Sequence, residues 1–311
     1  MNAKSYVSLL QEHELDYLST VDTSKMVALD LETAGLTPEA SQITQAGMVD
    51  ALTKRVLVSN RCQLTLETLG SLRKEAESSN LLGRGSTHWV LRYNNYHSIF
   101  KSYESYLLDP NNPAPVVTQK EGKLQVMPPD SERPLSPRDF RELLLSTENL
   151  LTEEALLLKI SSRMQEAPIG FSLVGQNILL FDLPFIMCRA AKYGITPWVP
   201  SSCVDTMWVS RILIIPALRT LCLEDPLSDR ILGTLGGYNR PSSSLQSLRK
   251  AFGCDGGVAH DAVGDCHTNV SVALALIAYA KHAQELLRAS ESLGLKYKAA
   301  VAQAASGPLK H

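Results

Sequence analysis

The sequence has few cysteines, and no two of them stand at the C-x-x-C spacing. The six are scattered at Cys62, Cys188, Cys203, Cys222, Cys254 and Cys266. This argues against a zinc knuckle and against a dense disulfide framework, because both need clustered cysteines. We therefore expect a reducing, intracellular location. The sequence does not distinguish among the cytoplasm, the nucleus and an organelle.

The chain also lacks a long apolar run. The longest one, residues 270–280, has the size of a core helix and falls short of the roughly 20 residues that span a bilayer. The first 30 residues contain acids but no apolar signal core. We expect neither export nor a membrane as partner.

A large net charge is missing too. The 311 residues are 44% hydrophobic and 20% charged, with a formal charge of −2. This is the composition of a soluble globular protein with one large domain or two ordinary ones. The charge neither indicates nor excludes a nucleic-acid partner, because a local basic surface is sufficient for binding.

The pattern of apolar residues and turn residues predicts hairpin strands first and strand–helix units later, which favours an α/β fold with a mixed sheet and helices on its faces. Strands are expected at 26–31, 41–52, 54–62 and 169–177, with a short strand that runs into a helix at 197–207 and a hairpin near 123–127. Helices are expected at 5–20, 65–108, 138–165, 181–194, 242–253 and 261–287.

This layout predicts a helical lead-in at 1–25, a main domain at 26–290 and a C-terminal tail at 291–311, of which residues 299–311 are expected to be frayed. Within the main domain, about residues 65–165 form a helical and irregular insertion, in which the proline-rich segment 109–137 has no regular structure apart from the hairpin. The glycine-rich segment 233–244 fits no phosphate-loop spacing and is expected to be a flexible loop near the site.

Two carboxylates end the apolar run of residues 26–29. Asp30 and Glu32 are one residue apart, so on a strand their side chains project to the same face. Adjacent anions repel each other unless a cation lies between them, and carboxylate oxygens are suitable ligands for Mg²⁺ or Mn²⁺. A pattern this short is equally compatible with a solvent-facing acidic strand end.

Two further segments place polar groups at element boundaries. Asn177 ends a predicted strand, and Asp182 lies in the first turn of the next helix, where an acid can simply complement the helix dipole. His260 and Asp265 are five residues apart at the start of the final helix, so both lie near one end of it. A histidine at such a place can also be a local hydrogen-bonding residue.

Together, these segments resemble the DEDDh, or DnaQ-like, family of 3′–5′ exonucleases in the ribonuclease H-like superfamily. The family motif D-x-E-T-x-G-L is similar to residues 30–36, G-x-N followed by F-D-x-x-F to residues 175–185, and H-x-A-x-x-D to residues 260–265. The D-T before a helix at residues 205–206 also matches. The resemblance covers about residues 26–60 and 168–287 and implies a ribonuclease H-like mixed sheet flanked by helices.

The resemblance also implies a reaction, the two-metal-ion hydrolysis of a phosphodiester that releases nucleoside 5′-monophosphates from a 3′ end. It makes His260 the general base, with an unperturbed histidine pKa of about 6.5. The expected ligands of two Mg²⁺ or Mn²⁺ ions are Asp30, Glu32, Asp182 and Asp265.

On the substrate side, the resemblance implies that the backbone at Thr33 and the side chain of Leu36 meet the terminal nucleotide, while Asn177 braces the site. Two positions depart from the family pattern, since Gln176 stands where many members have His and Cys266 where Ala is common. Neither departure removes an expected metal ligand or the base, so they affect the fit of the substrate rather than the chemistry.

Inside the insertion, aromatic residues recur at steps of four and three, the spacing of one helix face. They are Trp89, Tyr93, Tyr96, Phe100 and Tyr103. Such a stripe can stack on the bases of single-stranded nucleic acid, or it can be buried against the sheet or against another subunit. A homo-oligomer or a protein partner bound through residues 89–103 therefore remains open.

Three functions are compatible with these residues. The first is an exonuclease on single-stranded DNA or unpaired 3′ ends, and the second is the same chemistry on RNA in trimming or decay, a choice that depends on how the pocket meets a 2′-hydroxyl. The third is a catalytically silent module that binds nucleic acid or accompanies a polymerase. A full set of acids plus a histidine argues against the third.

Overall fold

The computed structural model describes residues 15–62, 116–120, 123–127, 150–196, 200, 202–257 and 261–306. The chain divides into two compact units. The first comprises Met1–Glu32, Gln45–Ser59 and Leu157–His311, and the second comprises Thr33–Thr44 and Asn60–Leu156. Within the described ranges, no helix combines the length and the apolar character needed to cross a membrane.

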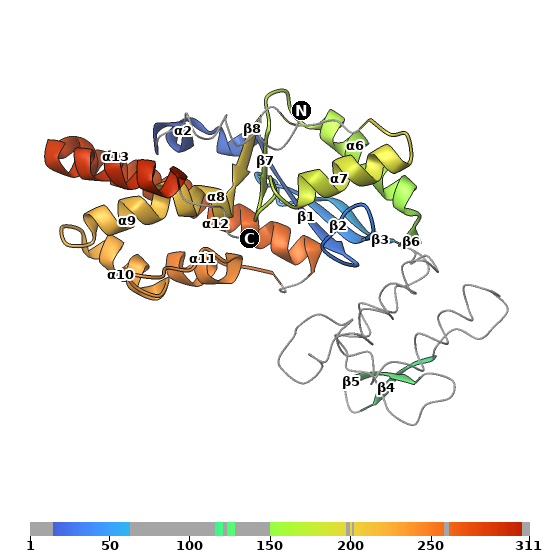
Figure 1. Cartoon of the computed structure of the whole chain (residues 1–311). Helices are drawn as coiled ribbons and strands as arrows, with labels where there is room; N and C mark the ends of the chain where they lie inside the picture. Colours follow the sequence, from blue (N-terminus) through green and yellow to red (C-terminus); the bar gives the residue numbers. More distant parts are fainter. Residues whose placement is uncertain are drawn as a thin grey trace. The chain divides into compact units, whose positions relative to one another are not determined.

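A mixed sheet of six strands has the order β6-β3-β2-β1-β7-β8 (Figure 1). Its strands are β1 (Met26–Thr33), β2 (Ile43–Asp50), β3 (Val56–Cys62), β6 (Leu150–Leu151), β7 (Ser172–Gly175) and β8 (Ser202–Asp205). β7 is parallel to both β1 and β8. Parallel strands end at the same edge of a sheet, so β1, β7 and β8 bring their carboxyl ends together there.

β1 and β2 run in opposite directions, because their hydrogen bonds join the start of one strand to the end of the other. The Ala51 N–H donates to the Met26 carbonyl, and the Ala34 N–H donates to the Gln42 carbonyl, both at 2.9 Å. The turn into β3 is closed by a 3.0 Å hydrogen bond from the Asp50 N–H to the Arg55 carbonyl. The first three strands thus form the predicted hairpins, which makes the sheet mixed.

Helices account for most of the rest of the described chain. They are α2 (Leu15–Thr20), α6 (Glu153–Glu166), α7 (Asp182–Lys192), α8 (Thr206–Val209), α9 (Ile215–Leu221), α10 (Pro226–Thr234), α11 (Leu245–Phe252), α12 (Ala262–Ala289) and α13 (Glu291–Ser306), with a 3-10 helix η1 (Thr23–Lys25) and a π-helix η4 (Ser210–Ile214). The long helix α12 packs against α2, β7 and α11 and buries Val270, Ala273 and Leu276 completely. This packing fixes the start of α12 relative to the sheet.

The second unit contains a separate antiparallel hairpin formed by β4 (Val116–Lys120) and β5 (Lys123–Met127). It also contains the parallel pair of β6 with the end of β3. The buried Glu153 carboxylate accepts a 2.8 Å hydrogen bond from the Ile43 N–H. The hairpin confirms the one predicted near residues 123–127.

Several predicted helix ends are also confirmed. α7 is followed by Gly194 with φ of +68°, and α11 ends at Gly253 with φ of +64°. In both cases the left-handed conformation, which glycine adopts without strain, stops the helix. The Ser244 side chain caps the start of α11 by accepting a hydrogen bond from the Ser247 N–H.

Two expectations about regular structure were wrong. Residues 299–311 were expected to be frayed, but residues 299–306 belong to α13 (Glu291–Ser306), in which five alanines favour a helix and Tyr297 is buried. Helical structure was expected throughout 138–165, but Leu150–Leu151 pair with β3 as a strand and the helix begins at Glu153. The aromatic stripe at 89–103 lies outside the described residues.

Asp225 links two helices of the first unit. Its carboxylate caps α10 by accepting hydrogen bonds from the Leu227 and Ser228 N–H groups, and it lies 3.1 Å from Nε2 of His282 on α12. The Ser228 hydroxyl is also 2.7 Å from the Tyr279 hydroxyl of α12. Burial acts to raise the pKa of Asp225, but the hydrogen bonds from Ser228 and His282 outweigh it and lower that pKa.

We expect the Asp225→Asn variant to be less stable at neutral pH by about 1 kcal/mol, because the amide oxygen can still cap α10 but the charge-assisted hydrogen bonds with Ser228 and His282 are lost. An acid with a lowered pKa in the folded state stabilises the protein above its unfolded pKa of about 4, and this contribution disappears as pH falls through the folded pKa. Urea unfolding at pH 7 and at pH 3 should therefore show a difference from wild type that shrinks in acid. Asp229→Asn, on the exposed face of the same helix, should show little difference at either pH.

Candidate metal centre

The carboxyl end of β1 has alternating burial, as the sequence predicts. Asp30 and Glu32 are half-buried, whereas Leu31 between them is buried. The two carboxylates therefore point to the same face of the strand. This confirms the geometric part of the prediction that was made from the D-x-E pattern.

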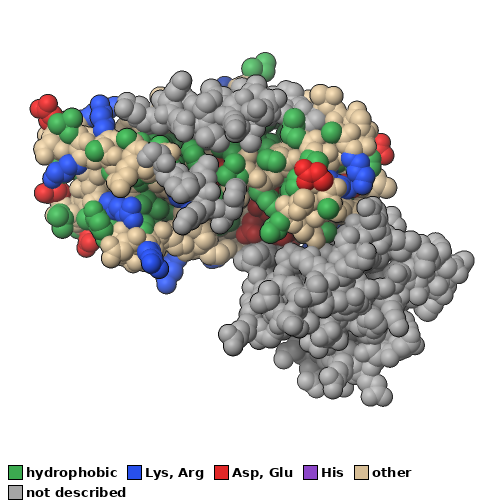
Figure 2. All heavy atoms as spheres, viewed as in Figure 1, with side chains coloured by type: hydrophobic (Ala, Val, Ile, Leu, Met, Phe, Trp, Pro, Cys, Tyr) green, Lys and Arg blue, Asp and Glu red, His purple; other side chains and the backbone are tan. Residues whose placement is uncertain are grey.

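The start of α12 adds a third acid. One carboxylate oxygen from each of Asp30, Glu32 and Asp265 lies within 4.8 Å of the other two. All three side chains are half-buried. The sequence separates Asp265 from the other two by more than 230 positions, so the fold alone brings them together. Figure 2 shows acidic side chains in a hollow of the described surface, in the area where Figure 1 draws α12.

Asp182, the first residue of α7, lies beside this trio but is held differently. Its Oδ1 accepts a 2.9 Å hydrogen bond from the Leu31 N–H, so the acid connects the start of α7 to the backbone between Asp30 and Glu32. Burial is the main cause that raises the pKa of Asp182 to about 8, with Asp205 and Glu32 adding to the effect. Asp182 therefore belongs to the acidic cluster, although its Oδ1 already accepts a hydrogen bond from the backbone of β1.

The electrostatics of the cluster favour a cation. Burial raises the pKa of Asp30 well above its ordinary value, and the negative charges of Asp182, Asp265, Glu32 and Asp261 raise it further, in that order. Nearby acids therefore oppose the ionised form of Asp30. A divalent cation would relieve this repulsion, and clustered carboxylate oxygens are the donors that Mg²⁺ and Mn²⁺ prefer.

The position of Asp265 depends on contacts between the start of α12 and β2. Asp261 caps α12 by accepting a hydrogen bond from the Gly264 N–H, and its other oxygen accepts a 2.9 Å bond from Nε2 of Gln45. The Cys266 thiol donates to the Gly47 carbonyl at 3.2 Å. A side chain at Gly47 would place its Cβ 2.5 Å from the carbonyl of Ala262. The lack of a side chain at Gly47 thus lets α12 approach the sheet.

We expect Gly47→Ala to displace the start of α12, because backbone atoms cannot yield as a flexible side chain can. The cost should be about 1–3 kcal/mol, as for other overpacked sites, and Mn²⁺ should stabilise the variant less than it stabilises wild type. Thermal unfolding with and without Mn²⁺ measures both effects. Gly233→Ala is the matched control, because a Cβ there meets nothing within 4 Å and alanine favours a helix. A Gly47→Ala protein with wild-type stability would contradict the tight contact.

A second anchor holds the loop between β7 and α7. The buried Asp205 carboxylate accepts hydrogen bonds from the N–H groups of Asn177 and Leu179 in this loop and from Met207 and Trp208 at the start of α8. Asn177 has a positive φ of 59°, which asparagine tolerates better than most residues. Asp205 therefore fixes the loop that leads to Asp182.

A polar network extends from this loop to the segment before α11 and to α12. The Thr206 hydroxyl contacts Oε1 of Gln176 at 2.6 Å and Oδ1 of Asn269 at 3.3 Å, and Nε2 of Gln176 donates to the Ser243 carbonyl at 2.8 Å. Within the described part of the chain, Oδ1 of Asn177 and Nδ2 of Asn269 are buried without a hydrogen-bond partner. Gln176, which departs from the family pattern, thus joins the loop to the segment before α11.

The other predicted site residues are Thr33, Leu36, Asn177 and His260, which are not part of the acidic trio. Thr33 and Leu36 belong to the second unit, where the Thr33 hydroxyl donates to the Gly35 carbonyl at 2.7 Å and the Leu36 side chain is 83% exposed. Asn177 braces the loop as described. His260 lies outside the described residues, which end at Gly257 and resume at Asp261. The roles of Thr33, Leu36 and His260 toward a substrate therefore stay predictions.

Sequence reasoning did not assign a role to Gln45, Gly47 or Asp205. Asp205 could have been found, because an acid followed by threonine at a strand–helix boundary is a helix-capping signal. Gln45 and Gly47 carry no such signal, since their partners Asp261 and Ala262 are more than 210 residues away.

In comparisons with known proteins, no family model matches the chain and a search of the curated proteins finds no match. Function is therefore inferred from the residues and their geometry.

Proposed function

We propose that this protein is a metal-dependent 3′–5′ exonuclease with a ribonuclease H-like fold, which hydrolyses single-stranded nucleic acid from its 3′ end. The observation that carries the proposal is the convergence of Asp30, Glu32 and Asp265 to within 4.8 Å, beside the buried Asp182. These are the acids that the family motifs select. A mixed sheet with helices on its faces is compatible with the proposed fold.

The acids would hold one or two Mg²⁺ or Mn²⁺ ions. Asp30, Glu32 and Asp265 present carboxylate oxygens at the mutual distances needed for one cation, and Asp182 lies close enough to raise the pKa of Asp30. When bound, such ions would neutralise charge on the phosphate and favour deprotonation of the attacking water. The substrate would be held with its 3′-terminal phosphodiester at the edge where β1 ends.

His260 would act as general base on the water. As the water oxygen bonds to phosphorus, its proton passes to the imidazole of His260, and the bond from phosphorus to the 3′ oxygen of the penultimate nucleotide breaks. That oxygen takes a proton from solvent, and the terminal residue leaves as a nucleoside 5′-monophosphate. The side chain of Leu36 would contact the terminal base, and the backbone at Thr33 would contact the terminal nucleotide. Asn177 would keep the loop before Asp182 in place.

Degradation of labelled single strands tests the proposal. We expect the full chain to shorten 5′-labelled DNA one nucleotide at a time in Mg²⁺ or Mn²⁺, and to release a labelled mononucleotide immediately from the same strand labelled at its 3′ end. An RNA strand of the same sequence, assayed in parallel, decides between DNA and RNA. EDTA should stop the reaction. Intact strands in both metals, or degradation that continues in EDTA, would contradict the proposal.

A further inference from the structure

A groove of about 850 Å³ lies in the first unit, outside the acidic cluster. Its walls come from α9, the turn after it, the loop that contains Tyr238 and Asn239, and one face of α13. On α13, Lys296, Ala300 and Ala304 are spaced four residues apart, so they lie along one stripe. The two alanines have short side chains, which leaves room for a ligand above the helix, while Lys296 stands at the end of the stripe.

Tyr238 is presented to this groove by a defined structure. The Arg219 guanidinium lies 5.5 Å from the centre of the Tyr238 ring, and its Nε donates to the Tyr238 carbonyl at 2.9 Å. Gly236 and Gly237 before it have positive φ angles, and the Gly237 N–H donates to the Leu232 carbonyl at 2.9 Å. The loop is thus tied to α9 and α10, yet the Tyr238 side chain remains 60% exposed. An exposed aromatic ring held in this way is ready to contact a flat ligand.

The charge of the groove indicates the ligand class. The described residues that line it include Arg219 and Lys296 but no Asp or Glu, and they add the polar side chains of Thr220 and Asn239. Figure 2 shows Lys and Arg side chains over the area of α9, α10 and α13, with Asp and Glu side chains among them, so the absence of acids holds for the lining of the groove. Cations beside an exposed aromatic ring are the combination that binds single-stranded nucleic acid, because phosphates meet the cations and a base stacks on the ring.

We propose that this groove binds a segment of single-stranded nucleic acid, with phosphates at Lys296 and Arg219 and a base against Tyr238. The ligand class rests on the proposed function, but the binding itself requires no hydrolysis. In an active exonuclease this contact would hold a part of the strand away from the cleaved end.

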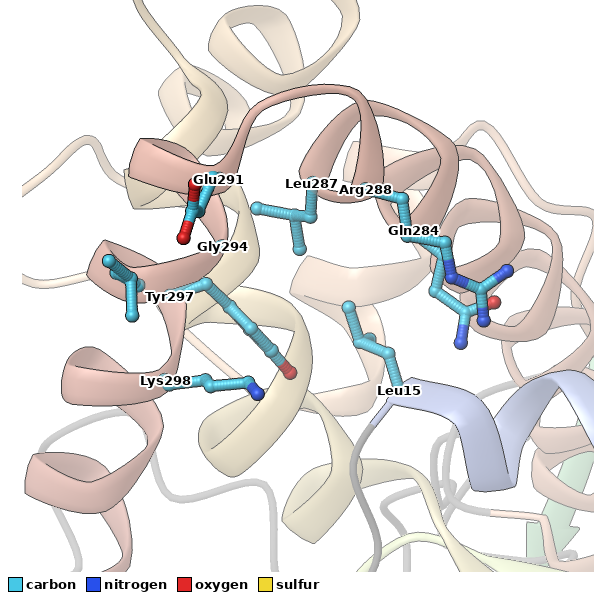
Figure 3. Close-up of a pocket in the computed structure, with 9 residues that line it drawn as sticks. Leu15, Gln284, Leu287, Arg288, Glu291, Gly294, Tyr297 and Lys298 are labelled. Carbon is cyan, nitrogen blue, oxygen red and sulfur yellow. The ribbon is translucent and has the colours of Figure 1, made fainter.

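The matched control is a lysine outside the groove, Lys298, which lines a second cavity of about 410 Å³. It lies between α2, α12 and α13, and Figure 3 shows Lys298 beside it together with Glu291 and Arg288. Lys298 is two positions from Lys296 on α13, so the two side chains point to different faces of the helix. Both are exposed. Lys298→Glu therefore makes the same charge change as Lys296→Glu outside the groove.

The test is fluorescence anisotropy of a labelled single strand with the full chain in EDTA, which prevents metal-dependent cleavage. We expect Lys296→Glu to weaken binding about tenfold at low salt and to reduce the slope of log affinity against log salt by about 0.7. Tyr238→Ala should weaken it about 5- to 150-fold, the range for the loss of one stacked base. Tyr238→Phe, which keeps the ring, and Lys298→Glu should bind nearly as wild type.

Wild-type affinity in both Lys296→Glu and Tyr238→Ala would overturn the proposal, as would an equal loss in Lys298→Glu. If those two groove variants bind the strand normally but lose binding of a poly-glutamate peptide, the groove docks an acidic protein segment and the nucleic-acid assignment is wrong. The exonuclease proposal fails independently. If the strand binds through the groove but is not degraded in Mn²⁺, the proposed reaction is wrong and the proposed binding site stands.

Discussion

The Asp30→Asn variant will fold and will have lost all degradation of nucleic acid that depends on Mg²⁺ or Mn²⁺. Asparagine keeps the size of aspartate but has one neutral amide oxygen, which is a weak metal ligand. The substitution therefore removes the carboxylate that the other acids of the cluster surround. In the metal-free protein, burial and the neighbouring acids disfavour the ionised form of this half-buried carboxylate, so its replacement by a neutral amide should also raise the melting temperature by about 2 °C or more. Gel assays of labelled strands and thermal unfolding in EDTA measure the two effects.

Opposite changes in stability and activity distinguish a functional acid from a structural one. With Mn²⁺ added, wild type should gain thermal stability by ligand binding, and Asp30→Asn should gain little. Asp229→Asn, an exposed acid on α10, should lose neither activity nor the response to Mn²⁺. Wild-type turnover in Asp30→Asn would show that the cluster is not the catalytic site.

The end of β1 could be predicted because its signals are local. An apolar run of four residues predicts a buried strand, and side chains that alternate along a strand place Asp30 and Glu32 on one face. The observed burial follows this alternation. The start of α12 was likewise recognisable, since Asp261 caps the helix and places Asp265 in its first turn.

Signals that depend on distant partners could not be predicted in the same way. Nothing in the sequence around Gly47 says that Ala262 will lie against it, or that Gln45 will bind Asp261. The two-residue strand β6 is too short for a periodic pattern, and only its pairing with β3 defines it. For α13, the alanine content favours a helix, but the alanine-rich segment at 299–311 was interpreted as a frayed tail.

The acidic cluster depends both on local sequence signals and on contacts with distant residues. The motifs placed Asp182 at the start of a helix, where a carboxylate can act on the helix dipole alone. In the structure it accepts a hydrogen bond from Leu31, 151 positions away. The resemblance predicted that Asp182 would lie with the other acids, and their mutual electrostatic effects agree with this. The backbone contact with β1 was not predictable, because it depends on how α7 approaches the strand.

Replacing His260 with alanine should slow hydrolysis by about 10²–10⁴-fold, the usual contribution of a general base. A base must be deprotonated to accept a proton, so wild-type activity should fall as pH decreases through a histidine pKa near about 6.5. That acid limb should be flatter in His260→Ala. The chain on either side of His260 is anchored, since the Gly257 N–H donates to Thr268 and Asp261 binds Gln45. The substitution should therefore leave folding and Mn²⁺ binding intact.

Rate measurements from pH 5.5 to pH 9, at saturating Mn²⁺ and with thermal unfolding as a check on the fold, separate the two possible roles of His260. His267→Ala, on α12 two residues after Asp265, is the control and should keep the wild-type pH profile. If His260→Ala is slow but retains the full acid limb, then another group titrates there. His260 would in that case act by local hydrogen bonding at the start of α12, and the proton of the attacking water would pass to a different base.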